Sequence, residues 1–485
     1  MCSQRNDERR PGRAILWVSI TLLVGAGAIT SQSFWMDEGN AIIKAMMPGL
    51  GEMWSFSKHM GGSEIQMPLF MLALWTWEKI SPSTEYALRL INLPFLLIMV
   101  MSLRKFRFWP LVCLLSPFVL YYVGELRPYM FQMAFSSLAL ASLLKHFEAE
   151  GEGEDASRTG LQLFFLSIVL LAATSLTAAV CSAGLALGLL AARPRLLSDR
   201  WFWFRMSMWV LPGALVAGYY GYTLIEGYRG AIERGGGLLS MGFGIYEIIG
   251  LVGLGPARDS MRDSGIGTLL GSHPWLPVAG VLLAAAWILG IRKLGARFTK
   301  REQIGLVCAF GIPVVILTAV AVLAHFSVLG RHMAPLIPAL LLPLATCVET
   351  ARRSRTALVL SILFLSCWVL SSFRIRFSKV FSRDDYRTAT SLAIEELEQG
   401  KSVLWYGDMN APRYYAMRLG GMPTVNFIQQ LESDRPSSPM FADVIFLNRP
   451  DLRFQNVPDY AEWLEGEGFS LATRLSGFEV WTTAR

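Results

Sequence analysis

Two adjacent acidic residues, Asp37 and Glu38, follow the first strongly hydrophobic segment of the chain, residues 14–30. A carboxylate at a water-accessible membrane surface can take a proton from a hydroxyl or an amine, so Asp37 suits a general base. Glu38 comes next and would point elsewhere on a helix, where it can orient the site or hold a cation. We therefore predict Asp37 and Glu38 as the catalytic residues of a reaction at the membrane boundary.

Basic residues recur where later hydrophobic segments begin or end. They are Arg89, Arg127 and Arg331, the last followed by His332. A guanidinium group matches phosphate oxygens in a bidentate manner and keeps its charge near lipid, and fixed cations stabilise a departing phosphate. A single arginine at a helix end can instead extend to the headgroups, but several on one face favour a substrate site. We expect these four residues to bind the phosphate of a lipid-linked substrate.

The composition is that of an integral membrane protein. Hydrophobic residues make up 53% of the 485 residues and charged residues 17%, whereas soluble domains are more polar. The net charge of +7 does not indicate nucleic-acid binding, because the basic residues form short clusters between apolar runs. The six cysteines show neither CxxC nor Cys/His spacing, so no disulfide framework and no zinc site is predicted.

Eleven hydrophobic segments are predicted to span the membrane. They are residues 14–30, 85–103, 108–123, 128–144, 161–175, 177–192, 206–224, 275–291, 303–324, 333–348 and 356–373. With the N-terminus in the cytoplasm, every short basic cluster falls in a cytoplasmic connection, as the positive-inside rule requires. Two further apolar stretches, 68–80 and 241–255, are too short for a hydrocarbon core of about 30 Å and are expected to lie at the outer surface.

Three regions are then extracytoplasmic: the loops 31–84 and 226–274, and the tail 374–485. The tail has no apolar run of spanning length, with strands predicted at 401–406, 442–447 and 478–483 and helices at 385–399 and 460–467. The predicted fold class is an α-helical polytopic protein of the plasma (inner) membrane. Residues 1–373 form its transmembrane catalytic domain, and residues 374–485 form a small, separate extracytoplasmic α/β domain.

Short motifs occur in a fixed order along this framework. Residues 34–38 (FWMDE), 67–70 (MPLF) and 87–92 (ALRLIN) resemble the opening of the GT-C glycosyltransferases, among them the protein O-mannosyltransferases and the lipid A aminoarabinose transferases. Residues 125–129 (ELRPY) and 330–335 (GRHMAP) resemble two further patterns of that group. The similarity covers most of the membrane part. Tyrosine is common in the group at the position of His332, which is a departure.

The resemblance implies a sugar donor on a polyprenyl phosphate, with Asp37 as catalytic base, Glu38 as the neighbouring acid and the three arginines near the lipid phosphate. We expect a hexosyl- or pentosyltransferase that acts on a lipid, protein or glycan acceptor outside the cytoplasm and inverts the anomeric centre. Some members of the group bind a divalent metal ion through a loop Glu and a later His. Glu64 and His273 are the possible equivalents here, and Glu64, Glu125 and His273 are the candidates for acceptor or metal contacts.

Two other classes of protein are alternatives to a transferase. A transporter or flippase of lipid-linked saccharides would be expected to place charges at mid-membrane and to show paired halves, whereas the charges here stand at the outer ends of the segments. A sensor anchored in the membrane would not need eleven spans. Sugar transfer is therefore the preferred function, with the transporter as the alternative.

Overall fold

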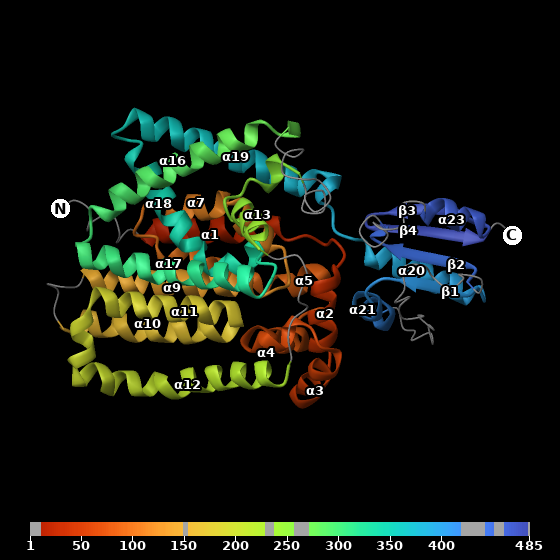
Figure 1. Cartoon of the computed structure of the whole chain (residues 1–485), viewed down its shortest axis with the longest axis horizontal. Coiled ribbons are helices and arrows are strands. Elements are labelled where there is room, and N and C mark those ends of the chain that lie inside the picture. Colours follow the sequence, from red (N-terminus) through yellow and green to blue (C-terminus); the bar gives the residue numbers. More distant parts are fainter. Residues whose placement is uncertain are drawn as a thin grey trace.

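The structure is a computed structural model that describes residues 11–148, 154–227, 237–256, 271–418, 442–450 and 460–483. Most of these residues are helical, and a small sheet lies in the C-terminal part beyond one end of the helices (Figure 1). The predicted outer loop 226–274 lies partly outside the described residues, at 228–236 and 257–270.

A helix or a pair of helices coincides with each of the eleven predicted spans. The unbroken ones are α1 (Pro11–Ala28), α9 (Tyr129–Glu148), α10 (Glu154–Thr174), α11 (Leu176–Ala192), α12 (Arg200–Ile225), α16 (Trp275–Gly295), α17 (Lys300–Leu323), α18 (Ile337–Thr350) and α19 (Arg355–Phe377). The other two are divided, into α5 (Glu85–Arg89) with α6 (Asn92–Ser102) and α7 (Trp109–Leu115) with α8 (Pro117–Val123). The second break falls at Ser116, which precedes a proline, is extended and caps α8 with its side chain.

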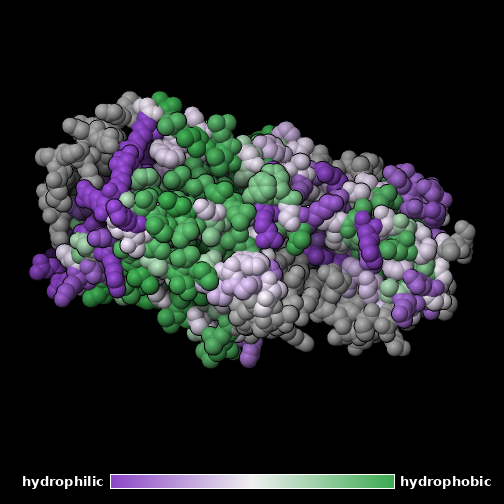
Figure 2. Space-filling view, turned by 90° about the horizontal axis from the view of Figure 1, so that it is seen from above, coloured by the Kyte–Doolittle hydropathy of each residue, from purple (hydrophilic) through white to green (hydrophobic). Residues whose placement is uncertain are grey.

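By length and composition alone, five helical segments of the described residues can cross a membrane. They are Glu85–Ser102, Trp275–Gly295, Lys300–Leu323, Gly330–Thr350 and Arg355–Phe377. Large apolar side chains are exposed on the helices, among them Leu23, Leu215, Val281 and Val307. Figure 2 shows this hydrophobic surface over the helical part, with hydrophilic residues towards both ends. A surface of this kind faces lipid; the number of eleven crossings stays a prediction.

The predicted cytoplasmic connections meet at one end of the helices. Ion pairs join Lys105 to Glu148, Arg193 to Glu302 and Arg297 to Glu349. Each pair links two connections, or a connection and a helix end, that are distant in the sequence. The short clusters of basic residues are thus neighbours in space, as expected if all of them face the same compartment.

Helices α11 and α17 approach closely through small residues. A Cβ atom on Gly188 would lie 2.5 Å from the backbone oxygen of Gly305, and one on Gly184 would lie 2.7 Å from that of Ala309. Because packing and not the hydrophobic effect holds helices together in lipid, small residues at such contacts matter.

Replacing Gly188 with leucine should push α11 away from α17. Overpacking of this kind costs about 1–3 kcal/mol, so the melting temperature in detergent should fall. The matched control is Gly213→Leu on α12, since an added Cβ there meets nothing within 4 Å. Equal melting temperatures for the two variants would contradict the close contact.

The C-terminal sheet has the strand order β1-β2-β4-β3. β1 (Val403–Tyr406) and β2 (Val444–Asn448) are parallel, and β4 (Phe478–Thr483) is antiparallel to both β2 and β3 (Phe469–Leu475). The helices of this part are α20 (Tyr386–Glu398), α21 (Asn410–Arg418) and α23 (Tyr460–Gly466). The predicted strands and helices are all present. β3 and α21 were missed, and β3 carries little signal because most of its residues are exposed or half-buried.

The C-terminal part packs directly on the first outer loop. This loop folds into α2 (Met36–Ala45), α3 (Leu50–Met60), the 3-10 turn η1 (Ser63–Gln66) and α4 (Pro68–Ile80). A Cβ on Gly39 of α2 would lie 2.7 Å from the Cα atom of Ala411 in α21. The backbone N–H of Phe34 donates to the hydroxyl of Tyr415 at 2.8 Å, and buried residues of both parts belong to one hydrophobic core. The two expected domains thus share a core, and a division at residue 373 stays a prediction.

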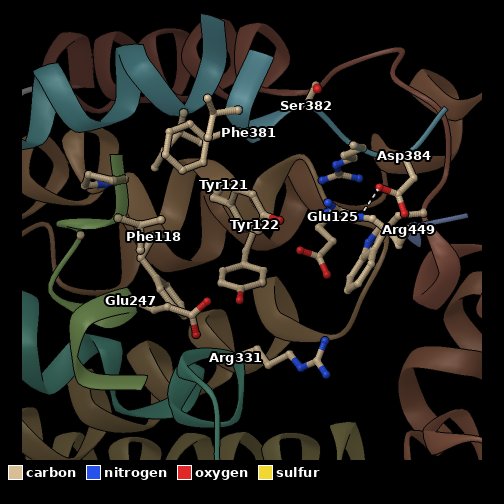
Figure 3. Close-up of a pocket in the computed structure, with 17 residues that line it drawn as sticks. Phe118, Tyr121, Tyr122, Glu125, Glu247, Arg331, Phe381, Ser382, Asp384 and Arg449 are labelled. Carbon is tan, nitrogen blue, oxygen red and sulfur yellow. Dashed lines mark ion pairs between the residues drawn. The ribbon is translucent and has the colours of Figure 1, made fainter. Parts of the chain in front are cut away.

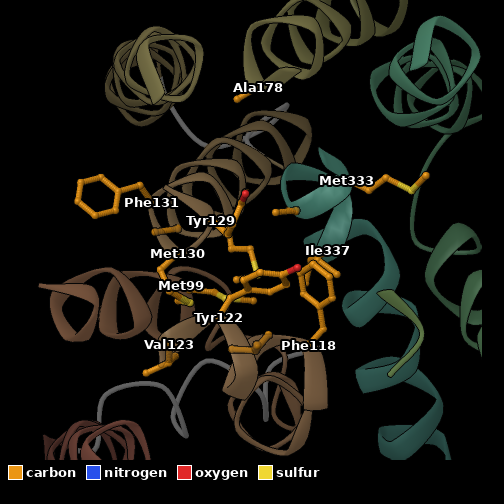
Figure 4. Close-up of a cluster of buried hydrophobic side chains, with 14 of the residues drawn as sticks. Met99, Phe118, Tyr122, Val123, Tyr129, Met130, Phe131, Ala178, Met333 and Ile337 are labelled. Atoms are coloured by element: carbon orange, nitrogen blue, oxygen red, sulfur yellow. The ribbon is translucent and has the colours of Figure 1, made fainter. Parts of the chain in front are cut away.

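A cluster of buried side chains supports the turn between α8 and α9 (Figure 4). Tyr122 at the end of α8 and Tyr129 at the start of α9 pack edge to face, with ring centroids 4.7 Å apart. Met333 of η4 (Gly330–Leu336) and Ile337 of α18 are buried in the same core. This packing fixes the turn that carries Glu125 and Arg127.

Candidate active site

Glu38 lies in α2, within the predicted first outer loop, and is fully buried. Arg89 donates to its carboxylate from Nε at 2.9 Å and from Nη2 at 2.7 Å, and the backbone N–H of Leu126 donates at 2.7 Å. Arg383 donates to Oε2. Burial by itself raises the pKa of Glu38, but Arg383 and Arg89 outweigh this effect and hold the pKa at about 2. Glu38 therefore stays ionised and organises the site around it.

Arg89 is also fully buried, and its guanidinium is used entirely by the protein. Besides Glu38, it donates to the backbone oxygens of Thr30, Gln32 and Ser33 at 2.7–3.3 Å. These bonds occupy every N–H of the side chain. In this arrangement no donor is left for a phosphate. Arg89 therefore holds Glu38 and the preceding segment in place and does not make the predicted phosphate contact.

Arg127 forms a second buried network. It donates to Glu64 Oε1 at 2.5 Å, to Ser63 Oγ at 2.8 Å and to the backbone oxygen of Asp37 at 3.1 Å. Lys44 donates to Glu64 Oε2 at 2.7 Å. Burial by itself raises the pKa of Glu64, but Arg127 and Lys44 outweigh it and hold the pKa at about 2. Glu64 and Arg127 therefore hold the first outer loop in place, and neither residue lines the cavity described below.

The residues present do not fit a metal ion. Within the described part of the chain, no group of three or more His, Cys, Asp or Glu side chains stands close enough to hold one. Both oxygens of Glu64 are bound to cations. The ring of His273 contacts Ser272 and Trp275. Glu64 and His273, the possible equivalents of the metal ligands, thus do not form a metal site with other described residues.

Asp37 and Arg331 pair across the site. Arg331 Nη1 donates to Asp37 Oδ2 at 2.8 Å, and both side chains keep some exposure, 16% and 17%. Their contact joins the first outer loop to η4, so two of the predicted residues do converge. His332 is turned elsewhere: its Nδ1 accepts from the backbone N–H of Leu329 at 3.0 Å, and its ring packs on Phe326. His332 thus shapes η4 and does not line the cavity.

A cavity of about 190 Å³ opens beside Arg331 (Figure 3). One wall is apolar and comes from α8 and the segment after α19, while the other carries charges. The apolar residues include Phe118, Tyr121, Val380 and Phe381, and the charged ones are Glu125, Glu247, Arg331, Arg383, Asp384 and Arg449. Such a combination suits a ligand with a hydrocarbon chain and an anionic head.

Arg383 was not predicted as a site residue. It follows α19 and the turn η5 (Lys379–Phe381), donates to the backbone oxygen of Gly124 at 2.9 Å as well as to Glu38, and lines the cavity. It lies ten residues beyond the hydrophobic segment 356–373, and Arg374, Arg376 and Lys379 are closer to that segment, so the sequence does not single it out. Glu247 of α13 (Leu238–Ile248) was missed too, and its Oε2 accepts from the backbone N–H of Gly330 at 2.6 Å.

Glu125 lies in the turn after α8. Asn92 donates to its backbone oxygen at 2.7 Å, which fixes the turn. The side chain is buried and lines the cavity, and its Oε1 has no hydrogen-bond partner in the part of the chain that the structure describes. Burial raises the pKa of Glu125. Arg383 opposes this effect and Glu38 adds to it, and the resulting pKa is about 7.

No protein-family model matches the sequence, and no curated protein matches it significantly. Among solved structures, the chain is similar to ArnT from Cupriavidus metallidurans in the apo state, with a TM-score of 0.54 and 13% identity over 97% of each chain. It is also similar to ArnT from that organism bound to undecaprenyl phosphate, with a TM-score of 0.53 and 13% identity over 97% of this chain and 98% of that one. At this identity the likeness shows the fold alone, and it confirms the predicted polytopic helical architecture with a small C-terminal domain.

Proposed function

We propose that the chain transfers a sugar from a polyprenyl-phosphate donor to an acceptor at the outer membrane face. The observation that carries the proposal is the cavity, where an apolar wall meets Arg331 and Arg383 beside Asp37. The shared fold adds support, because the ArnT of similar structure binds undecaprenyl phosphate. The transporter alternative gains no support from the site, because its ion pairs gather at one end of the helices.

Two cations of the cavity suit a phosphate. Arg331 and Arg383 both line it, and their guanidinium groups are held in place by ion pairs with Asp37 and Glu38. The monophosphate that leaves the sugar carries close to two negative charges at neutral pH. Fixed cations that need no rearrangement stabilise this charge as the bond breaks.

In the proposed complex, the prenyl chain lies along Phe118, Tyr121 and Phe381, and the phosphate meets Arg331 and Arg383. Asp37 keeps Arg331 oriented through their ion pair. The roles predicted for Asp37 as base and Glu38 as the neighbouring acid stay predictions. Glu38 supports Arg383 in the same way as Asp37 supports Arg331.

The direct test compares glycans and lipids by mass spectrometry in cells with and without the chain. Loss of one sugar modification, with its lipid-linked sugar accumulating, is the expected result. An unchanged profile of glycans and lipid-linked sugars would argue against transfer.

Replacing Arg331 with alanine should weaken donor binding. A charged hydrogen bond is worth about 1.5–3 kcal/mol, so the KM for the lipid-linked donor should rise by roughly 10- to 100-fold. The matched control is Arg301→Ala, an exposed arginine at the other end of the helices. A KM that is equal in both variants would remove Arg331 from the donor site.

A further inference from the structure

The acids around the cavity differ in what already binds them. Glu38 accepts from two arginines and a backbone N–H, and Glu64 pairs with Arg127 and Lys44. Asp37 pairs with Arg331. Glu125 has no ion pair or side-chain hydrogen bond among the contacts found within the described residues, although it is buried. A buried carboxyl group without a partner is costly and calls for a ligand.

Glu125 also has the position that a ligand would need. It lines the cavity together with Arg331 and Arg383, whereas Asp37 does not. Figure 3 shows its carboxyl group directed into the space near Tyr122 and Arg331. A group that enters the cavity beside the two arginines therefore meets the Glu125 side chain, whose Oε1 is buried and has no hydrogen-bond partner among the described residues.

We propose that Glu125, and not Asp37, accepts the proton of the attacking group, and that this group is a hydroxyl; the inference rests on the proposed function. The hydroxyl oxygen forms a bond to the anomeric carbon of the sugar. The bond from that carbon to the phosphate oxygen breaks, and its electron pair goes to the phosphate held by Arg331 and Arg383. The proton passes to the Glu125 carboxylate.

Chemistry favours a hydroxyl as the acceptor group. A phosphate acceptor is already ionised at neutral pH and would need no base. A hydroxyl group has a proton to lose, and the carboxylate of Glu125, which lines the cavity, can accept a hydrogen bond from it.

The charges around Glu125 determine how the reaction responds to pH. The groups that face it are Arg383 after α19, Glu38 and Asp37 of α2, Arg331 of η4, Tyr122 of α8 and Tyr129 of α9, with Glu247 of α13 across the cavity. Since its pKa is about 7, Glu125 is about half ionised at neutral pH. A general base with a pKa near the working pH is efficient, because a large fraction of it is ionised and its carboxylate still binds a proton well. The rate should therefore rise with pH up to about 7 and then level off.

The experiment uses the full chain in lipid nanodiscs with a panel of undecaprenyl-phosphate-linked sugars and hydroxyl-bearing lipids, and it measures the release of undecaprenyl phosphate. In Glu125→Gln, kcat should fall by roughly 10²–10⁴-fold, and the rise with pH should disappear. Binding of undecaprenyl phosphate itself should be unchanged or tighter, because a negative charge near the phosphate is removed. In Asp37→Asn, the pH dependence should persist and the KM of the donor should rise.

The opposite results distinguish failure of the inference from failure of the proposed function. A Glu125→Gln variant that keeps the pH dependence of the wild type, or that loses undecaprenyl phosphate binding, overturns the inference alone. A wild-type chain that binds undecaprenyl phosphate but releases none from any sugar of the panel overturns the proposed function as well. The melting temperature at pH 8 separates these outcomes from misfolding: Glu125→Gln should melt no lower than the wild type, since no charged carboxylate must then be buried.

Discussion

Replacing Glu38 with glutamine should destabilise the chain more than any other single change at the site. Arg89 is fully buried and Arg383 nearly so, and both lose their anionic partner. Removal of one member of a buried ion pair costs about 3–5 kcal/mol, because it leaves an uncompensated charge. We expect a clearly lower melting temperature together with loss of transfer, measured by thermal unfolding and by release of the lipid phosphate.

The effect of Glu38 should also appear in the dependence of stability on pH. Its pKa is lowered in the folded chain, from 4.5 to about 2. Its contribution is therefore complete above about pH 4.5 and disappears as the pH falls towards 2. As the pH falls across this interval, the difference in melting temperature between the wild type and Glu38→Gln should disappear. The control is Glu398→Gln on the exposed side of α20, and a Glu38 variant as stable as this control would contradict the network.

Replacing Arg383 with alanine should have the largest effect on activity that is not due to unfolding. Arg89 remains to compensate Glu38, so the fold should survive. The cavity, however, loses one of the two cations proposed to meet the phosphate. Loss of one group that stabilises developing charge costs about 10²–10³-fold in rate, and undecaprenyl phosphate should bind more weakly.

Two further variants sharpen this test. Arg383→Lys keeps the charge but not the planar fork that reaches Glu38 and the backbone oxygen of Gly124 together, so it should recover part of the activity. Arg387→Ala on α20 removes an arginine that pairs with Glu85 and is half exposed, and it should be nearly as active as the wild type. If Arg383→Ala and Arg387→Ala turn over equally fast, Arg383 does not contact the phosphate.

Sequence patterns were most reliable where the responsible forces act locally. The helices coincide with the hydrophobic segments, because each apolar run needs an internally hydrogen-bonded backbone in lipid. The strands β1, β2 and β4 were predicted from short apolar runs, whereas the largely exposed β3 left no such pattern. Asp37, Glu38, Arg127 and Arg331 lie close together, as expected from their positions at the ends of segments; that this face lies outside the cytoplasm stays a prediction.

The roles of individual charges did not follow from the sequence. Arg89, Arg127 and Arg331 all stand near the ends of hydrophobic segments. Arg89 forms an ion pair with Glu38 and Arg127 with Glu64, and of the three only Arg331 lines the cavity. Arg383 lines the cavity beside Arg331, although it is 345 positions away from its partner Glu38. Which cation meets which carboxylate depends on the packing of loops that are distant along the chain.

The amino-acid sequence by itself determined that this is a polytopic helical membrane protein with acids and arginines gathered at one face, because hydrophobicity and charge decide which segments enter lipid and where they stop. Only the tertiary structure decided that the C-terminal part docks on the first outer loop, that Arg383 lines the cavity and that Glu125 finds no partner among the described residues. Those outcomes depend on distances of a few ångströms between residues hundreds of positions apart, and no local pattern encodes them.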